Sequence, residues 1–164
     1  MQRALAFLLL MLLASLSLFA EKEKKSDLLS VGVGVFNVLR DKQRTIEYQL
    51  EYEWGANWND IHPIVGLMVT QHKGLFIYGG FSIDLQFGPI LFSPSFAPGY
   101  YYKGDGKDLG FPLEFRSAVA LAYVFKNQSR LGLQFYHISN AKLGNKNPGE
   151  ESLVLFYSFA LGRR

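Results

Sequence analysis

The chain has 164 residues, no cysteine and a formal charge of +3, from 17 Lys and Arg against 14 Asp and Glu. The small net charge argues against a nucleic-acid partner, and the lack of cysteine excludes a disulfide framework. Aromatic residues are abundant, with 14 Phe, 9 Tyr and 2 Trp. After residue 20, however, no apolar run reaches the roughly 20 residues of a membrane-spanning helix.

The N-terminus is typical of a secretory signal peptide that is removed from the mature protein. Arg3 precedes an unbroken apolar run over 4–13, and small or apolar residues over 14–20 precede the charged stretch EKEKK. The alternative is a retained transmembrane helix, for which the run is too short. We therefore expect a signal peptide over residues 1–20, a solvated periplasmic tail over 21–27 and a single β-barrel domain over 28–164.

From Leu28 onward, apolar residues recur with a period of two, which is typical of β-strands. The clearest segment is 45–54, where apolar and aromatic residues alternate with charged and polar ones. The sequence predicts eight strands of about ten residues, the length of a tilted membrane strand. They begin at Leu28 and at Thr45, and six more lie at about 61–70, 75–87, 90–102, 111–125, 130–139 and 151–159.

The two faces of each predicted strand differ in the way that a small membrane barrel requires. Over 111–125, bulky residues such as Phe115 and Leu121 alternate with small or charged ones such as Arg116 and Ala120. Lipid outside and a tight polar filling inside would produce this asymmetry. We therefore predict an all-β fold, an eight-stranded antiparallel transmembrane β-barrel. The alternatives are a soluble sandwich and a lipocalin-like barrel with its bulky face inward.

Three groups of residues carry further expectations for this barrel. Charged residues of the polar face should be paired inside it: Glu47, Glu51, Glu53, Asp84, Glu114 and Arg116. Aromatic residues near strand ends should form interfacial girdles: Trp54, Trp58, Tyr100, Tyr101, Tyr123 and Tyr157. Pro63, Pro94 and Pro98 should weaken their strands, and His62 and His72 are interpreted as ordinary polar groups at the rim.

The stretch from Leu131 to Phe159 places three chemically distinctive residues together. His137 and Ser139 share one face with Leu131, Leu133 and Phe135, and Glu151 shares one with Leu153, Leu155, Tyr157 and Phe159. If Glu151 pairs with His137, every further pair is apolar: Phe135 with Leu153, Leu133 with Leu155 and Leu131 with Tyr157. Ser139, His137 and Glu151 are then a nucleophile, a base and its orienting acid. Glu150, of opposite parity, is interpreted as solvated loop.

These residues resemble the lipid A 3-O-deacylase family of Gram-negative outer membranes. The family motif is His-x-Ser-Asn with a glutamate twelve residues after the serine, and the chain has HISN with Glu151 at that distance. Asn147 and Gly149 also stand where the family usually has these residues. The motif covers about fifteen residues, and the signal sequence and eight-strand pattern agree over the rest.

The resemblance implies an outer-membrane serine esterase that removes the 3-O-linked acyl chain of lipid A, with Ser139, His137 and Glu151 as its triad. Oxyanion donors would be the Asn140 side chain and a backbone N–H at Ala141 or Lys142, supported by Asn147. Lys142, where family members often have glycine, and Lys146 would be weak contacts to lipid A phosphates.

The expected partners are lipopolysaccharide and outer-membrane lipids, with a homodimer included among the expected assemblies and no nucleic acid. No metal-ligand spacing or phosphate-binding loop is evident, so no cofactor is expected. Two other functions stay open at this stage. One is an outer-membrane phospholipase with the same three residues, and the other is a structural or adhesion barrel whose loops bind a partner.

Overall fold

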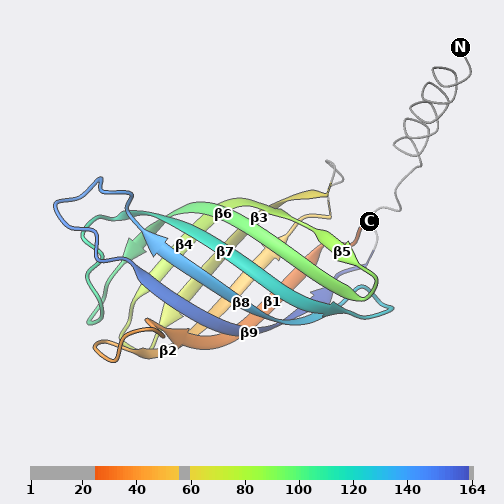
Figure 1. Ribbon diagram of the computed structural model, residues 1–164, viewed down its shortest axis with the longest axis horizontal. Helices are drawn as coiled ribbons and strands as arrows, with labels where there is room; N and C mark the ends of the chain where they lie inside the picture. The colour runs from red at the N-terminus through yellow and green to blue at the C-terminus, as the bar shows by residue number, and fades with distance from the viewer. Residues whose placement is uncertain (1–24, 56–59, 163–164) are drawn as a thin grey trace, which may run out of the picture.

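The computed structural model describes residues 25–55 and 60–162, and these form one antiparallel sheet that closes on itself (Figure 1). The expected signal peptide and Trp58 lie outside the described residues. The strands are β1 (Leu28–Phe36), β2 (Thr45–Glu53), β3 (Ile61–Thr70), β4 (Leu75–Ile83), β5 (Leu85–Phe87), β6 (Ile90–Tyr102), β7 (Leu113–Val124), β8 (Arg130–Ser139) and β9 (Glu150–Ala160). None of the described residues form a helix long and apolar enough to cross a membrane.

Closure of the sheet makes this a barrel of eight strands, as predicted. β1 pairs with both β2 and β9, so the first and last strands meet. β4 and β5 are two parts of one strand, interrupted at Asp84, and both pair with β6. Because the closed sheet has no free edge, each of the eight strands has a neighbouring strand on both sides. The predicted segment 75–87 corresponds to β4 and β5 together.

The two ends of the barrel differ. Leu28 pairs with Ala160, so β1 begins and β9 ends at the same end, which we call the terminal end. The opposite end, which we call the loop end, carries the connections 37–44, 71–74, 103–112 and 140–149 (Figure 1). The longer polar connections therefore gather at one end, as the sequence predicted.

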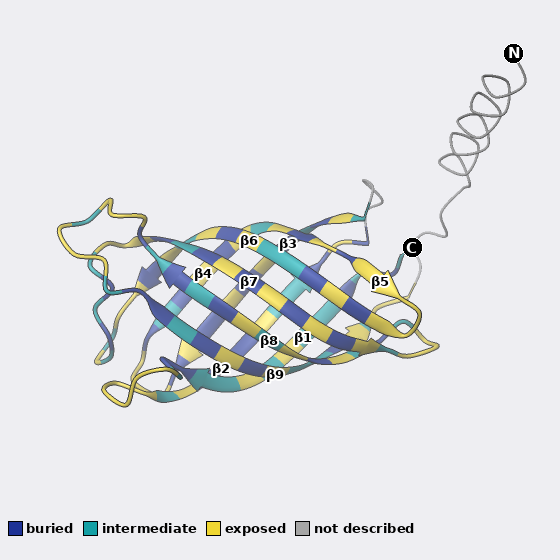
Figure 2. Cartoon of the chain, in the orientation of Figure 1, coloured by how far each residue is buried: buried dark blue, intermediate teal, exposed yellow. Residues whose placement is uncertain are grey.

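Side chains alternate along the strands between an exposed and a buried position (Figure 2). Outward residues are large and apolar, for example Val33, 47% exposed, Tyr48, 49% exposed, and Leu121, 59% exposed. The inward residues next to them are small or polar. This arrangement matches lipid outside and a filled interior, and it excludes the lipocalin-like alternative, in which the bulky face would point inward.

A buried arginine organises the middle of the interior. The Arg116 guanidinium lies between the rings of Tyr78 and Tyr136, at 4.7 Å and 4.8 Å from their centroids. It also lies 3.7 Å from the Glu51 carboxylate, and its Nη2 donates to Gln134 at 2.5 Å. The expectation that the six charged residues point inward is confirmed. Glu47 and Glu114 differ from the predicted ion pairing. The Glu47 carboxylate accepts hydrogen bonds from neutral hydroxyls, and the buried Glu114 carboxylate forms no ion pair with another described residue.

The prolines of β6 disturb one ladder without ending the strand. β6 pairs continuously with β7 through Pro94 and Pro98. Its pairing with β4 stops after Tyr78–Gly99 and resumes at Phe81–Phe96, beside the missing N–H of Pro98. The expected weakness is therefore confined to one side of β6.

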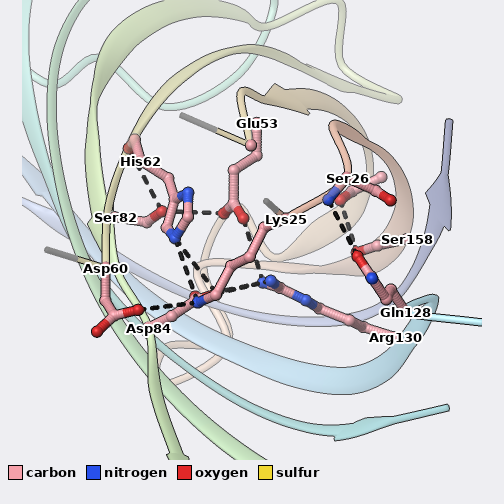
Figure 3. A network of polar contacts seen from close by, with 12 residues as sticks. Lys25, Ser26, Glu53, Asp60, His62, Ser82, Asp84, Gln128, Arg130 and Ser158 are labelled. Atoms are coloured by element: carbon pink, nitrogen blue, oxygen red, sulfur yellow. Dashed lines mark hydrogen bonds and ion pairs between the residues drawn. The ribbon is translucent and has the colours of Figure 1, made fainter. Parts of the chain in front are cut away.

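A cluster of charged side chains fills the terminal end of the barrel (Figure 3). Asp84 receives Lys25 Nζ at 3.1 Å and Arg130 Nη2 at 2.6 Å, and Arg130 Nη1 lies 3.3 Å from Glu53. His62 is fully buried, so its interpretation as a rim residue is wrong. Lys25, expected in a solvated tail, instead inserts among these carboxylates. The Lys25 side chain therefore contributes to the filling of this end.

The same cluster contains three groups that could ligate a metal ion. Ligand atoms of Glu53, His62 and Asp84 lie within 4.8 Å of one another. No metal-ligand spacing is visible in the sequence, because these residues come from β2, β3 and the break after β4. Lys25 and Arg130 already bring positive charge to this position, with Lys25 Nζ 3.5 Å from His62 Nε2. The cluster is therefore explained as an ion-pair network.

Asp84 should contribute strongly to stability, because its side chain is fully buried against two cations. Replacing Asp84 with Asn leaves Lys25 and Arg130 without this counter-charge and should lower the free energy of unfolding by about 3–5 kcal/mol. Urea titration of the micelle-bound protein, followed by the mobility difference between folded and unfolded barrel, measures this loss. Ser95→Ala, also facing the interior, is the control, and equal midpoints for both variants would contradict the assignment.

Candidate functional site

A histidine and a glutamate are hydrogen-bonded on the outer surface of the barrel at the loop end. His137 on β8 and Glu151 on β9 are direct cross-strand partners. His137 Nδ1 lies 3.1 Å from Glu151 Oε1, and the side chains are 43% and 16% exposed. Because a carboxylate only accepts, Nδ1 carries the proton and Nε2 is left as a base. The predicted register, including the three apolar pairs below this one, is confirmed.

Ser139 lies beside this pair at the end of β8. It is two residues beyond His137 on the same outward face, a separation of about 6.6 Å between Cα atoms. Within the described part of the chain, the Ser139 hydroxyl forms no hydrogen bond, so the structure brings His137 and Glu151 into contact and leaves Ser139 as a neighbour. A rotation about the side-chain bonds of Ser139 and His137 would close the remaining gap.

A second serine that sequence reasoning missed also lies next to His137. Ser117 on β7 is the direct cross-strand partner of His137, on the side opposite Glu151, and its side chain is exposed. Sequence analysis considered only the pairing of β8 with β9, and Ser117 follows from the pairing of β8 with β7. The site therefore offers two hydroxyls within reach of one imidazole.

The loop between β8 and β9 returns across the face of the imidazole at Gly149. Gly149 has φ of +57°, and a Cβ there would lie 2.7 Å from His137 Cε1. Any other residue would be strained and would displace the ring. Glycine at this position thus fixes the imidazole between the loop backbone and β9.

Asn140 organises the same loop from a fully buried position. Its Nδ2 donates to Leu109 O at 2.8 Å and to Lys146 O at 2.9 Å, and its Oδ1 accepts the Lys142 N–H at 3.0 Å. Its own N–H donates to Asn147 Oδ1 at 3.0 Å. Both expected asparagines are therefore in contact, and the Asn140 amide joins the β8–β9 loop to the β6–β7 loop.

The two lysines of the loop have different surroundings. Lys146 Nζ lies 3.0 Å from Asp108, and this hydrogen bond, together with the Gly110 N–H, lowers the pKa of the Asp108 carboxyl. Lys142 is exposed, and its φ of +65° is left-handed, as is the φ of +52° at Ala141. Left-handed backbone favours glycine, which agrees with the glycine that family members often have at Lys142.

Glu150 is the residue of this region whose predicted environment is wrong. It is fully buried inside the barrel and not in solvated loop. β9 already begins at Glu150, so strand parity turns its side chain inward while Glu151 points outward. Its Oε2 accepts the Asn37 N–H at 3.2 Å and lies 3.0 Å from Ser152 Oγ.

Comparisons with known proteins bear on the family and the fold. The family model described as lipid A 3-O-deacylase (PagL) matches residues 20–160. The chain is similar to the crystal structure of the outer membrane enzyme PagL, with a TM-score of 0.66 and 21% identity, covering 82% of this chain and 99% of that one. A de novo designed transmembrane β-barrel gives a TM-score of 0.54 at 15% identity, covering 85% and 98%. None of the individually curated proteins searched matches the chain.

The role of Asn140 in joining the β8–β9 loop to the β6–β7 loop can be tested by measuring the stability of a variant. Asn140→Asp cannot donate to Leu109 O and Lys146 O and would place a carboxylate against both carbonyls, so it should cost about 2–4 kcal/mol of unfolding free energy. Thermal unfolding measured by circular dichroism checks this. Asn127→Asp is the matched control, since Asn127 only accepts hydrogen bonds through Oδ1, from Ser129. Equal melting temperatures would refute the assignment.

Proposed function

Because the chain belongs to the lipid A 3-O-deacylase (PagL) family, we propose that it hydrolyses the 3-O-linked acyl ester of lipid A with a Ser139–His137–Glu151 triad. A role as an ester hydrolase of lipid A in the Gram-negative outer membrane follows from the family. The identity of the nucleophile and the outer-leaflet location are proposals. The observation that carries the proposed triad is the His137–Glu151 hydrogen bond with Ser139 beside it on the lipid-facing surface.

The proposed reaction proceeds in two steps. His137 Nε2 takes the proton of the Ser139 hydroxyl as Oγ attacks the ester carbonyl, and Glu151 stabilises the resulting imidazolium through Nδ1–H. The imidazolium then protonates the leaving sugar oxygen, and the acyl chain stays on Ser139. In the second step His137 takes a proton from water, which attacks the acyl ester, and returns it to Ser139. The products are a 3-hydroxy fatty acid and lipid A shortened by one chain.

Stabilisation of the oxyanion involves the loop that follows Ser139. Lys142 N–H and both N–H groups of the Asn140 amide have partners in this conformation. The backbone N–H of Ala141, which forms no hydrogen bond within the described residues, is the donor at hand. We infer that the Asn140 amide becomes the second donor by exchanging one loop carbonyl for the oxyanion, while Asn147 holds the backbone.

The proposed setting is the outer leaflet, with the loop end facing outward. His137, Ser139 and Glu151 then stand at the height where ester bonds of lipid A meet the acyl region, above a wall of apolar residues on β8 and β9. Polar residues on a lipid-facing wall are costly without a function. Lys142 is the more available of the two proposed phosphate contacts, since Lys146 is paired with Asp108. The homodimer stays a prediction.

The decisive experiment is mass spectrometry of lipid A incubated with the refolded protein and its variants. The wild type should release one 3-hydroxyacyl mass, and Ser139→Ala should lower the rate by at least about 10³-fold. Ser117→Ala is the matched control, because it removes the other hydroxyl beside His137 and should retain activity.

Each other outcome changes a named part of the proposal. Loss of activity in Ser117→Ala with retention in Ser139→Ala would move the nucleophile to β7. Cleavage of glycerophospholipids with lipid A untouched would make the protein a phospholipase. If folded wild type cleaves neither lipid, the enzyme assignment fails and the structural barrel remains.

A further inference from the structure

The segment 148–151 makes two independent contacts with His137. Glu151 accepts a hydrogen bond from the imidazole, and Gly149 packs its backbone against Cε1 of the ring. Because both contacts come from one short segment, the position of that segment relative to β8 sets the position of the base. Whatever holds this segment therefore acts on His137.

The start of the β1–β2 connection holds the segment from the opposite side. Asn37 N–H donates to Glu150 Oε2 at 3.2 Å, and Val38 N–H donates to Glu151 O at 2.7 Å. Arg40 Nη1 adds a bond to Pro148 O at 3.0 Å. Three donors of the segment 37–40 thus meet three acceptors of 148–151, and only the bond to Glu150 uses an acceptor side chain.

Glu150 is also tied into the interior of the barrel. Ser152 Oγ lies 3.0 Å from both Glu150 Oε2 and Glu47 Oε2, and Glu47 is held by Tyr136 as well. Since a hydroxyl donates one proton, one of the two serine contacts requires a protonated carboxyl. Ser152 thus links the two buried glutamates into one hydrogen-bonded group on the inner side of the strands that carry the candidate site.

A buried lysine extends the contact to a third connection. Lys107 Nζ donates to Asn37 Oδ1 at 2.7 Å, and Asn37 Nδ2 donates to Lys42 O at 2.7 Å. Lys107 is 6% exposed, and Asn37 is 1% exposed with a φ of +59°. The Asn37 backbone is thus fixed in a left-handed conformation by its own side chain, with its N–H aimed at Glu150.

We propose that Glu150 is a positioning residue, which acts together with Asn37 to hold Glu151 and Gly149 against His137. The proposal rests on the proposed function of the His137–Glu151 pair. Strand parity allows one segment to have both roles, because adjacent residues of β9 point to opposite sides of the barrel wall. Glu150 is anchored in the dry interior while Glu151 faces the substrate.

A double-mutant cycle with Glu151 tests whether Glu150 acts through it. Glu150→Ala should lower kcat about 10- to 100-fold with KM unchanged, because the base is misplaced while the lipid-binding wall is intact. Added to Glu151→Ala, the same change should cost less than about threefold more. A purely structural role predicts the same fold-loss in both backgrounds, which would overturn the proposal.

Two further variants separate positioning from general destabilisation. Glu150→Gln should stay within about threefold of wild type, since its amide oxygen, in the place of Oε2, still accepts from the Asn37 N–H and from the Ser152 hydroxyl. Ser158→Ala is the matched control. It removes a buried hydroxyl contact of the same strand, with Ser30 at 2.7 Å, at the terminal end. Full activity in Glu150→Ala would overturn the proposal.

A readout that needs no turnover keeps this test distinct from the test of function. In ¹⁵N-histidine-labelled protein, the Nδ1–H proton of His137, assigned by its loss in Glu151→Ala, should disappear or broaden in Glu150→Ala and persist in Glu150→Gln and Ser158→Ala. If the wild type is inert but this signal responds as described, the proposed function fails and the positioning stands. A signal unaffected by Glu150→Ala would refute the positioning, whatever the activity.

Discussion

The rest of the structure depends on the hydrogen-bond closure of the barrel wall. Water does not reach the backbone of a strand that faces lipid, so its hydrogen-bonding groups must be satisfied by neighbouring strands. β1 must therefore pair with β9, and every strand must have two neighbours. Closure fixes the register, and the register fixes which side chains point to each side. The site is a consequence of this geometry, because one-residue slippage between β8 and β9 would separate His137 from Glu151 and turn one of them inward.

Closure also creates a narrow interior that must be filled without leaving charges unpaired. The chain fills it with a cluster of apolar and aromatic side chains, among them Phe36, Met68 and Phe76, and with compact charged networks. Arg116 lies between two tyrosines, and Arg130 and Lys25 balance carboxylates at the terminal end. Such networks are costly to break, because removal of one partner leaves the other buried and unpaired.

Much of this was predictable from the sequence, because the signals were local or had a strict period. The alternation of apolar and polar residues predicted the strands. The matched apolar pairs from Phe135–Leu153 to Leu131–Tyr157 predicted the register between β8 and β9. The wrong environments of His62 and Glu150 have different causes. β9 begins one residue earlier than predicted, and strand parity then turns Glu150 inward. His62 lies within the predicted segment 61–70, where parity already turns it inward, and the interpretation as a rim residue overlooked this. Ser117 was missed because its proximity to His137 depends on a second register, between β7 and β8. The loop contacts of Asn140 and Asn37 join segments distant in sequence, and no periodic pattern reports them.

The alternation of inward and outward side chains explains how a single sheet can carry both a reactive outer surface and the residues that position it. In a globular enzyme, the residues that orient a catalytic group usually surround it on several sides. On a lipid-facing wall the outer side must stay open to substrate, so support has to come from the inward residues between the outward ones. Tyr136 and Ile138 flank His137 in this way, and Glu150 and Ser152 flank Glu151. All four are buried, and three of them, Tyr136, Glu150 and Ser152, belong to the network that reaches Asn37. The polar residues of the interior are therefore connected to the chemistry of the outer surface. They lie on the same two strands as His137 and Glu151, so their positions affect the positions of these two side chains.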